Sequence, residues 1–251
     1  MINPNLNPID YEKKYHKLIK RLSAINLFPI NKTIVLKRHC LALLKFTFAV
    51  NKLKTMELTE FIEIYNCKKS IILLEGKRNV LESDKEKLIQ LGSLLASCLP
   101  LATFRSGNAD GADFYFSKGV LRVAPDRLQV ITPYKNHRQK TNKANETISL
   151  DQIDLLNEPA VVYQSKNNKK TKSLIDKYVA GAIDRFSIKA AYIISDTIKV
   201  TGTKSGIPPI DFAFFYDDEQ KPKTGGTGHT MDICEINNVD YLTQKQWYNW
   251  I

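Results

Sequence analysis

Apolar residues follow two different spacings along this chain, and the change between them falls near residue 69. Before that point apolar side chains recur at helical spacing, with lysines between them. This pattern predicts one helix beginning at Asp10, a second over Thr33–Leu53 and a short third over Thr59–Tyr65. We therefore expect residues 1–68 to form a basic, helical N-terminal region that caps the rest of the chain.

Short apolar runs and helical stretches alternate in residues 69–251. The runs that predict strands are Ser70–Gly76, Leu101–Arg105, Leu128–Thr132, Ile210–Tyr216 and Asp240–Leu242. Between the first two, Ser83 and Glu86 have the Ser-x-x-Glu form of a capping box, and leucines follow on one helical face. Alternation of this kind is typical of βαβ units. The predicted fold class is therefore α/β, with a parallel sheet flanked by helices.

Residues 135–172 interrupt this alternation. The stretch is polar and rich in lysine, most of all over Lys166–Lys172. We interpret it as an insertion with one short helix near Leu150–Leu156 and a mobile, solvated basic loop; a lid that contacts substrate phosphates is the alternative. His137 lies in this insertion, where we expect a solvated side chain. A helix is predicted to follow over about Ser173–Phe186.

The composition indicates a globular protein with room for one large domain or two small ones, since the chain has 251 residues of which 43% are hydrophobic. No run of about 18 apolar residues occurs, so no membrane span is expected. The first residues lack a basic segment followed by an apolar one, so we expect no secretory signal and a cytoplasmic protein. The cysteines are scattered without a C-x-x-C pair, which favours reduced thiols over a zinc site.

Positive charge is concentrated near the N-terminus. The net charge of the chain is +11, and residues 1–70 hold 13 Lys and Arg against 5 Asp and Glu, a net +8. A lysine-rich solvated surface is the commoner meaning of such a bias. Contact with nucleic acid through the basic N-terminal helices is the alternative, because clustered positive charge attracts phosphate backbones.

The strongest chemical signal is a glycine-rich turn, Thr224–Asp232, which follows the predicted strand Ile210–Tyr216 and can begin a helix. A strand, a glycine turn and a helix N-terminus place several free N–H groups and a helix dipole at one point, which favours an anion such as phosphate. The turn is neither a Walker loop nor a G-x-G-x-x-G fingerprint, so ATP hydrolysis and NAD binding gain no support. A tight strand-to-helix turn without a ligand is the alternative.

Three glycine-containing turns, each after a predicted strand, together resemble the loops of the SLOG superfamily. They are Gly76-Lys77-Arg78, Ser106-Gly107-Asn108-Ala109-Asp110-Gly111-Ala112-Asp113 and Gly225-Gly226-Thr227-Gly228-His229-Thr230. That superfamily includes the DNA-processing protein A fold and the "lonely guy" nucleoside-monophosphate phosphoribohydrolases. The second turn is similar to its Ser-Gly-Gly-Ala-x-Gly-Ala-Asp pattern, with Asn108 in place of the second glycine. The resemblance extends from about Ser70 to Leu242 and leaves residues 1–68 unexplained.

The resemblance implies a Rossmann-like sheet that holds the phosphate of a nucleotide or an ADP-ribose-like molecule between the three turns. We expect neither a metal nor a cofactor. Members of the superfamily commonly form dimers, which implies a homo-oligomer here. Arg78 is the candidate phosphate clamp, because a guanidinium makes bidentate contacts to oxyanions. The nucleotide-binding candidates are Gly76, Arg78, Ser106, Gly107, Asp110, Gly111, Asp113, Gly225, Gly226, Thr227, Gly228, His229 and Thr230.

Three residues are candidates for catalysis if the chain is an enzyme. Phosphoribohydrolases of the superfamily carry Pro-Gly-Gly-x-Gly-Thr-x-x-Glu, and alignment on Gly225-Gly226 puts Asp232 at the glutamate and His229 at the threonine. Such a carboxylate stabilises positive charge as an N-glycosidic bond breaks. Asp is one methylene shorter than Glu, and Arg185, the candidate for the arginine that these enzymes need, lies farther from Gly225 than in the family. Asp232 has the alternative role of favouring the helix N-terminus through the helix dipole.

Three functions therefore follow, in order of preference. The first is a nucleotide-binding or nucleotide-sensing protein, which needs only the three turns and Arg78. The second is an N-glycosidase that releases the base from a nucleotide and needs Asp232 in addition. The third is single-stranded DNA binding by the basic N-terminal helices, whose affinity would fall steeply with salt. A resemblance in fold does not decide among them.

Overall fold

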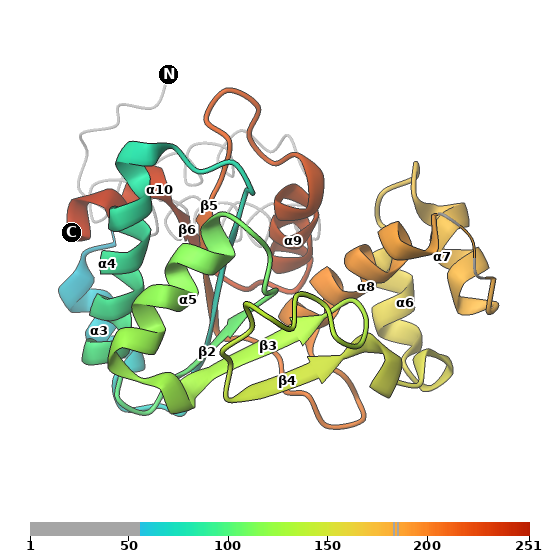
Figure 1. The fold of residues 1–251 in the computed structure, drawn as a ribbon, viewed down its shortest axis with the longest axis horizontal. Helices are drawn as coiled ribbons and strands as arrows, with labels where there is room; N and C mark the ends of the chain where they lie inside the picture. Colours follow the sequence, from blue (N-terminus) through green and yellow to red (C-terminus); the bar gives the residue numbers. More distant parts are fainter. Residues whose placement is uncertain (1–55, 183, 185) are drawn as a thin grey trace, which may run out of the picture. The chain divides into compact units, whose positions relative to one another are not determined.

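The computed structural model describes residues 56–182, 184 and 186–251, which belong to a compact unit spanning Leu53–Ile251. At its centre lies a six-stranded sheet in the order β4-β3-β2-β1-β5-β6, and every neighbouring pair of strands is parallel. This confirms the predicted α/β class with a Rossmann-like parallel sheet (Figure 1). The helices predicted for residues 10–53 lie outside the described residues.

Most strands of the sheet coincide with the predicted apolar runs. In chain order the strands are β1 (Ile71–Gly76), β2 (Thr103–Ser106), β3 (Leu128–Thr132), β4 (Glu146–Ser149), β5 (Phe212–Tyr216) and β6 (Tyr241–Thr243). β4 lies inside the stretch 135–172 that we interpreted as an insertion, so part of that stretch belongs to the sheet. Its sequence Glu-Thr-Ile-Ser has one apolar residue and forms an edge strand with Glu146 and Thr147 exposed, which explains why no apolar run marks it.

Each face of the sheet is covered by its own set of helices. They are α3 (Leu58–Tyr65), α4 (Glu82–Cys98), α5 (Ala112–Val123), α6 (Pro159–Ser165), α7 (Lys172–Val179), α8 (Ser187–Thr201), α9 (Gly225–Ile236) and α10 (Gln244–Trp247). Successive strand residues point to opposite faces. In β5, Phe212 and Phe214 pack with α3, α4, α5 and α10, whereas Phe215 packs with α9. Figure 1 shows α4 and α5 on one side of the sheet and α8 and α9 on the other.

Helix α3 matches the predicted short helix at 59–65 and packs on the sheet. The ring of Phe61 is fully buried, with centroids 5.0 Å from Phe212, 5.2 Å from Phe214 and 5.4 Å from Trp250. Aromatic contacts at these distances add to the burial of large apolar surfaces. The domain boundary that the sequence placed at residue 68 therefore falls between α3 and the sheet against which α3 packs.

Several predicted helix positions are wrong in detail. The Ser83–Glu86 capping box does not form, because α4 begins at Glu82 with Leu81 at its N-cap. Two 3₁₀ turns, at 150–152 and 155–157, replace the short helix expected near 150–156. The helix expected over 173–186 ends at Val179, and the long helix α8 follows it.

Helix α8 is a further element that the sequence pattern did not reveal. From Ala190 to Val200 it contacts α6, α7 and α9, and most of its residues are buried. Buried polar residues interrupt its apolar pattern, namely Ser195, Asp196, Thr197 and Lys199. No helix in the described part of the chain is long and apolar enough to cross a membrane.

Candidate functional site

The candidate site lies where β1, β2 and β5 end. β1 and β5 are neighbours, but the chain leaves β1 towards β2 on one side and leaves β5 towards β6 on the other. In open parallel sheets, ligands bind at such a switch point, beyond the carboxyl ends of the strands. The three glycine turns singled out in the sequence follow these three strands.

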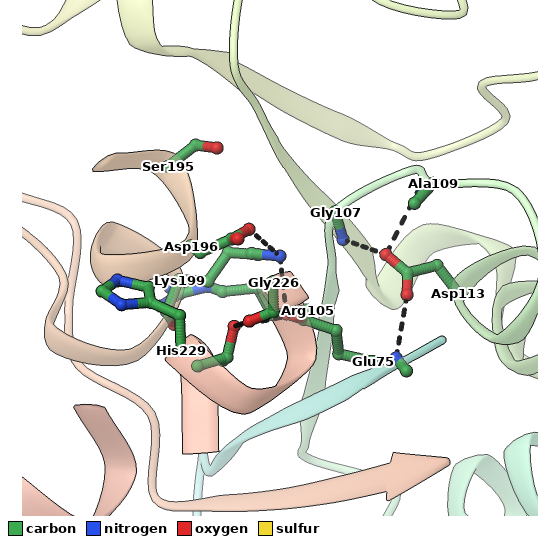
Figure 2. A network of polar contacts seen from close by, with 12 residues as sticks. Glu75, Arg105, Gly107, Ala109, Asp113, Ser195, Asp196, Lys199, Gly226 and His229 are labelled. Carbon is green, nitrogen blue, oxygen red and sulfur yellow. Dashed lines mark hydrogen bonds and ion pairs between the residues drawn. The ribbon is translucent and has the colours of Figure 1, made fainter. Parts of the chain in front are cut away.

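Asp113 connects the first two turns through hydrogen bonds to the backbone of both. Its side chain is 1% exposed, in the first turn of α5, and it accepts N–H bonds from Gly76 at 3.1 Å, Gly107 at 3.1 Å and Ala109 at 3.4 Å. Figure 2 shows the Asp113 carboxylate facing the backbone of Gly107 and Ala109. Burial raises the pKa of Asp113, while Lys199 and the N–H bonds act in the opposite direction. Its polar atoms are occupied within the protein, so the structure gives Asp113 a role in shaping the two turns.

A buried lysine links β1 to α8 beneath the turns. Lys199 Nζ lies 2.5 Å from Glu75 Oε2 and 2.8 Å from Asp196 Oδ1. Glu75 also accepts a hydrogen bond from Thr230 of α9, 2.8 Å from its Oε1. The lysine and glutamate side chains are 4% and 6% exposed. We refer to Glu75, Asp196 and Lys199 as the ionic cluster; it connects the end of β1 with both α8 and α9.

Burial favours the protonated form of Glu75 in the ionic cluster. Burial raises the pKa of Glu75 to about 8; Lys199 opposes this effect, and the charges of Asp196 and Asp113 add to it. The pKa of Lys199 is raised as well, because its neighbouring carboxylates outweigh its burial. An ionised Glu75 would add negative charge beside Asp196 and Asp113, which act on the same ammonium group, and uncompensated charge in the interior is costly.

Two glycines bring the backbone of the turns directly against these side chains. A methyl group on Gly107 would lie 2.8 Å from Lys199 Nζ and 2.9 Å from Asp113 Oδ2. A methyl group on Gly226 would lie 3.1 Å from Asp196 Oδ2. The ionic cluster therefore lies directly under the second and third turns, with room for glycine only at Gly107.

The third turn is the start of a helix, because Gly225, Gly226, Thr227, Gly228, His229 and Thr230 all lie in the first turns of α9. Gly228 donates its N–H to the carbonyl of Thr224, 3.1 Å away. Helix geometry leaves the N–H groups before it without partners within the helix. Gly225 has φ of +67° with nothing near its Cβ position, and both it and Gly226 are exposed. This end of α9 can therefore accept an anion from solvent.

Arg78 is the exposed cation of the first turn. Its guanidinium lies 5.7 Å from the ring centroid of Tyr192 on α8, and no carboxylate within the described residues pairs with it. Its backbone meets Gly111, where a methyl group would lie 2.1 Å from the Arg78 carbonyl oxygen and where φ is +84°. Arg78 thus combines a fixed backbone with an exposed charge that no described carboxylate neutralises.

His229 and Asp232, two of the catalytic candidates, have partners within the protein. His229 is 9% exposed, and its Nε2 lies 3.0 Å from Thr197 Oγ1 of α8, which also accepts a hydrogen bond from Ser165. Burial lowers the pKa of His229. Asp232 pairs with Lys223 at 2.9 Å, on the partly exposed side of α9. The third catalytic candidate, Arg185, lies outside the described residues.

Two further binding candidates in the second turn, Asp110 and Ser106, differ in exposure and in hydrogen bonding. Asp110 is exposed and pairs with Arg138 at 2.8 Å, so its carboxylate is already engaged. Ser106 is fully buried at the end of β2, and its hydroxyl has no hydrogen-bond partner among the described groups. Thr227 and Gly228 are buried in α9, where Gly228 packs against the backbone of Lys223.

The expectation that His137 is solvated is wrong. Its side chain is 3% exposed, and neither ring nitrogen has a hydrogen-bond partner among the described residues. The ring packs edge-to-face between Tyr134 and Tyr192, with centroid distances of 4.8 Å and 5.5 Å. Burial lowers the pKa of His137 to about 4, and the positive charges of Arg138 and Arg78 act in the same direction.

Sequence reasoning missed the ionic cluster. Glu75 did carry a signal, since it is a carboxylate at the end of the apolar run Ile-Ile-Leu-Leu. Asp196 and Lys199 carried none, because α8 was not predicted. No group of three or more His, Cys, Asp or Glu side chains suited to a metal ion occurs in the part of the chain that the structure describes.

Comparisons of the chain with protein-family models, with curated proteins and with solved structures find no match. The function is therefore inferred from the geometry at the carboxyl ends of β1, β2 and β5.

Proposed function

We propose that this protein binds a nucleotide, or an ADP-ribose-like molecule, with its phosphate at the N-terminus of α9 and against Arg78, and that it acts as a nucleotide-binding or nucleotide-sensing protein similar to SLOG members. One observation carries the proposal. The turns after β1 and β2 and the start of α9 converge on one ionic cluster at the switch point of a parallel sheet. The exposed start of α9 and the exposed guanidinium of Arg78 in the first turn are both suited to phosphate.

A carboxylate beside these donors favours a nucleotide over a free phosphate. Asp196 bonds Lys199 through Oδ1, while its Oδ2 lies beside the exposed Gly226. A carboxylate oxygen accepts hydrogen bonds from hydroxyl groups. Donors for phosphate and an acceptor for sugar hydroxyls then stand side by side, which is the combination that a sugar phosphate requires.

Binding without chemistry is preferred over base release. An N-glycosidase would use Asp232 at the scissile bond, but this carboxylate is paired with Lys223. No described contact places Asp232 at the ionic cluster. We therefore do not propose base release, and the experiment below measures it directly.

Thermal unfolding against a panel of ligands tests the proposal. The panel comprises nucleoside monophosphates, ADP-ribose, NAD and a short DNA single strand, and each small-molecule sample is analysed afterwards for free base. A ligand at about 100 times its Kd adds roughly 2.7 kcal/mol of stability. We expect stabilisation by at least one nucleotide and no release of base.

Two variants locate the binding. Gly226→Asp places a negative charge at the exposed start of α9, beside Asp196, and should abolish the ligand-induced shift. Gln90→Asp is the control, because it makes the same change of charge at an exposed position of α4. The ligand should stabilise this variant as it stabilises the wild type. No shift with any nucleotide, or equal shifts in both variants, would refute the proposal. Released base would make the protein an enzyme, and a shift with the DNA strand alone would favour nucleic acid as the ligand.

A further inference from the structure

Three aromatic rings meet beside the proposed phosphate site. Tyr134 follows β3, His137 lies three residues later, and Tyr192 projects from α8. The centroids are 4.8 Å apart for Tyr134 and His137, 5.5 Å for His137 and Tyr192, and 6.4 Å for the two tyrosines, and all three pairs are edge-to-face. We refer to these residues as the aromatic cluster.

The imidazole at the centre of the aromatic cluster has unmet hydrogen-bonding capacity. A neutral histidine offers one N–H donor and one nitrogen acceptor. Both ring nitrogens of His137 are buried, and neither has a partner within the described residues. Buried polar groups in native proteins are hydrogen-bonded with few exceptions, and each exception calls for an explanation. A ligand that supplies the missing partners is such an explanation.

The backbone is held so as to present this ring. Asn136 and Arg138, on either side of His137, have φ of 62° and 47°, a region that non-glycine residues seldom occupy. Asn108 of the second turn donates to the His137 carbonyl oxygen at 3.2 Å, and Arg138 donates to the Asn108 carbonyl oxygen at 3.2 Å. Unusual backbone conformations persist when the surroundings fix them, and they are frequent at ligand sites.

The aromatic cluster adjoins the proposed phosphate site through Arg78. The guanidinium of Arg78 lies over the ring of Tyr192, and the charges of Arg78 and Lys199 both act on the His137 imidazole. The turn after β2, which Asp113 fastens to the first turn, also holds His137 through Asn108. A molecule with its phosphate at Arg78 therefore has this cluster within its neighbourhood.

We propose that Tyr134, His137 and Tyr192 form the subsite that recognises the base of the bound nucleotide, with the ring nitrogens of His137 bonding the polar edge of the base. The inference rests on the proposed function. The faces of tyrosine rings suit a planar heterocycle by stacking, whatever its identity. The donor and acceptor of the imidazole add discrimination, because a base with the wrong edge leaves them unpaired.

Entry of the base requires a local movement. Tyr134 is 36% exposed and packs directly on His137, whereas the imidazole is covered. We infer that rotation of the Tyr134 side chain opens the imidazole to a ligand. In its opened position the tyrosine ring is available to stack on the base.

Calorimetric titration of His137→Phe tests the subsite. The probes are AMP, GMP, CMP and UMP, with ribose 5-phosphate as a probe that lacks a base. In the wild type we expect a preference among the four nucleotides. In His137→Phe we expect that preference to shrink by about tenfold or more, the effect of losing a discriminating hydrogen bond. Affinity for ribose 5-phosphate should change by less than about twofold.

A second variant and a stability measurement separate recognition from packing. His137→Gln keeps one donor and one acceptor and should retain part of the base preference. Without ligand, His137→Phe should melt at the wild-type temperature or above it, because a buried polar group without partners is replaced by an apolar ring. A loss of stability together with an unchanged base preference would show that the imidazole is satisfied in the ligand-free protein, and would overturn the subsite.

The possible failures are distinguishable. If the wild type binds nucleotides without any preference, or if His137→Phe keeps the preference of the wild type, the subsite is refuted while nucleotide binding stands. If the wild type binds none of the four nucleotides, no ribose 5-phosphate, no ADP-ribose and no NAD, the proposed function fails and the subsite falls with it.

Discussion

At the scale of single residues, the decisive feature is a lysine buried among carboxyl groups. Lys199 is 3% exposed and lies against Glu75 and Asp196, with Asp113 adding to the surrounding negative charge. A buried ion pair contributes little net stability compared with apolar residues, but loss of one partner is costly. The cluster therefore fixes the arrangement of β1, α8 and α9 more than it stabilises the fold.

Lys199→Met should lower the free energy of unfolding by about 3 kcal/mol, because carboxyl groups remain buried without their cation. Adding Asp196→Asn to this variant should recover part of the loss, since it removes a carboxyl group that Lys199 compensates in the wild type. Urea unfolding of both single variants and the double variant gives the coupling between them. Lys118→Met, at an exposed position of α5, serves as the control and should stay within about 0.5 kcal/mol of the wild type. Additive effects of the two cluster substitutions would contradict a direct coupling.

The buried Glu75 should make the free energy of unfolding depend on pH. Burial raises the pKa of Glu75 from 4.5 in the unfolded chain to about 8, so the folded protein holds one more proton than the unfolded chain between these values. This contribution to stability is complete below about pH 4.5 and is lost as the pH rises through 8. Relative to Glu75→Gln, the wild type should therefore lose stability between pH 5 and 8, by at most about 1.4 kcal/mol per pH unit. Unfolding curves that shift in parallel for both proteins would exclude this titration.

At the scale of secondary-structure elements, α8 connects the site with the rest of the fold. It supplies Asp196 and Lys199 to the ionic cluster and Tyr192 to the aromatic cluster. The same helix presents Thr197 to His229 of α9 and to Ser165 of α6. One helix thus positions the polar groups of both subsites and holds two neighbouring helices in place.

Thr197→Val should show whether the contact between Thr197 and His229 stabilises the fold or contributes to ligand binding. The substitution preserves the shape of the fully buried side chain and removes the hydroxyl shared by His229 and Ser165. We expect a loss of about 2 kcal/mol in the free energy of unfolding, because two buried polar groups lose a partner. The nucleotide Kd, measured by calorimetry, should stay within about twofold. A much weaker Kd with unchanged stability would show that His229 acts on the ligand.

The sequence predicted the elements that have a simple apolar period and missed those that do not. β1, β3 and β5 consist mostly of apolar residues and lie close to their predicted positions, whereas β4 is an edge strand with one apolar residue. Helix α8 is buried on so many sides that its polar residues, Lys199 among them, are also inside, and the apolar spacing of a surface helix is lost. The positions of such elements depend on tertiary contacts, which the apolar pattern of the sequence does not reveal.

At the scale of the whole described unit, the order of the strands makes a site out of distant segments. Gly76, Gly107 and Gly226 come from three separate parts of the chain, and the parallel sheet places all three turns at one edge. Their glycine-rich character and their position after strands could be predicted from the sequence. The partners of the turns could not: Lys199 contacts Glu75 across 124 positions of the chain. Nor could the burial of His137, because its environment is formed by Tyr192 from another element.

Amide hydrogen exchange with and without a bound nucleotide tests most directly whether these turns form one site. On addition of a nucleotide that stabilises the protein, we predict slower exchange at both 107–111 and 225–227, because backbone N–H groups at the start of α9 bond the phosphate and the second turn closes on the ligand. Gln90→Asp should show the same protection and Gly226→Asp should lose it at both turns. Protection at only one of the two turns, or only elsewhere in the chain, would contradict a shared nucleotide site.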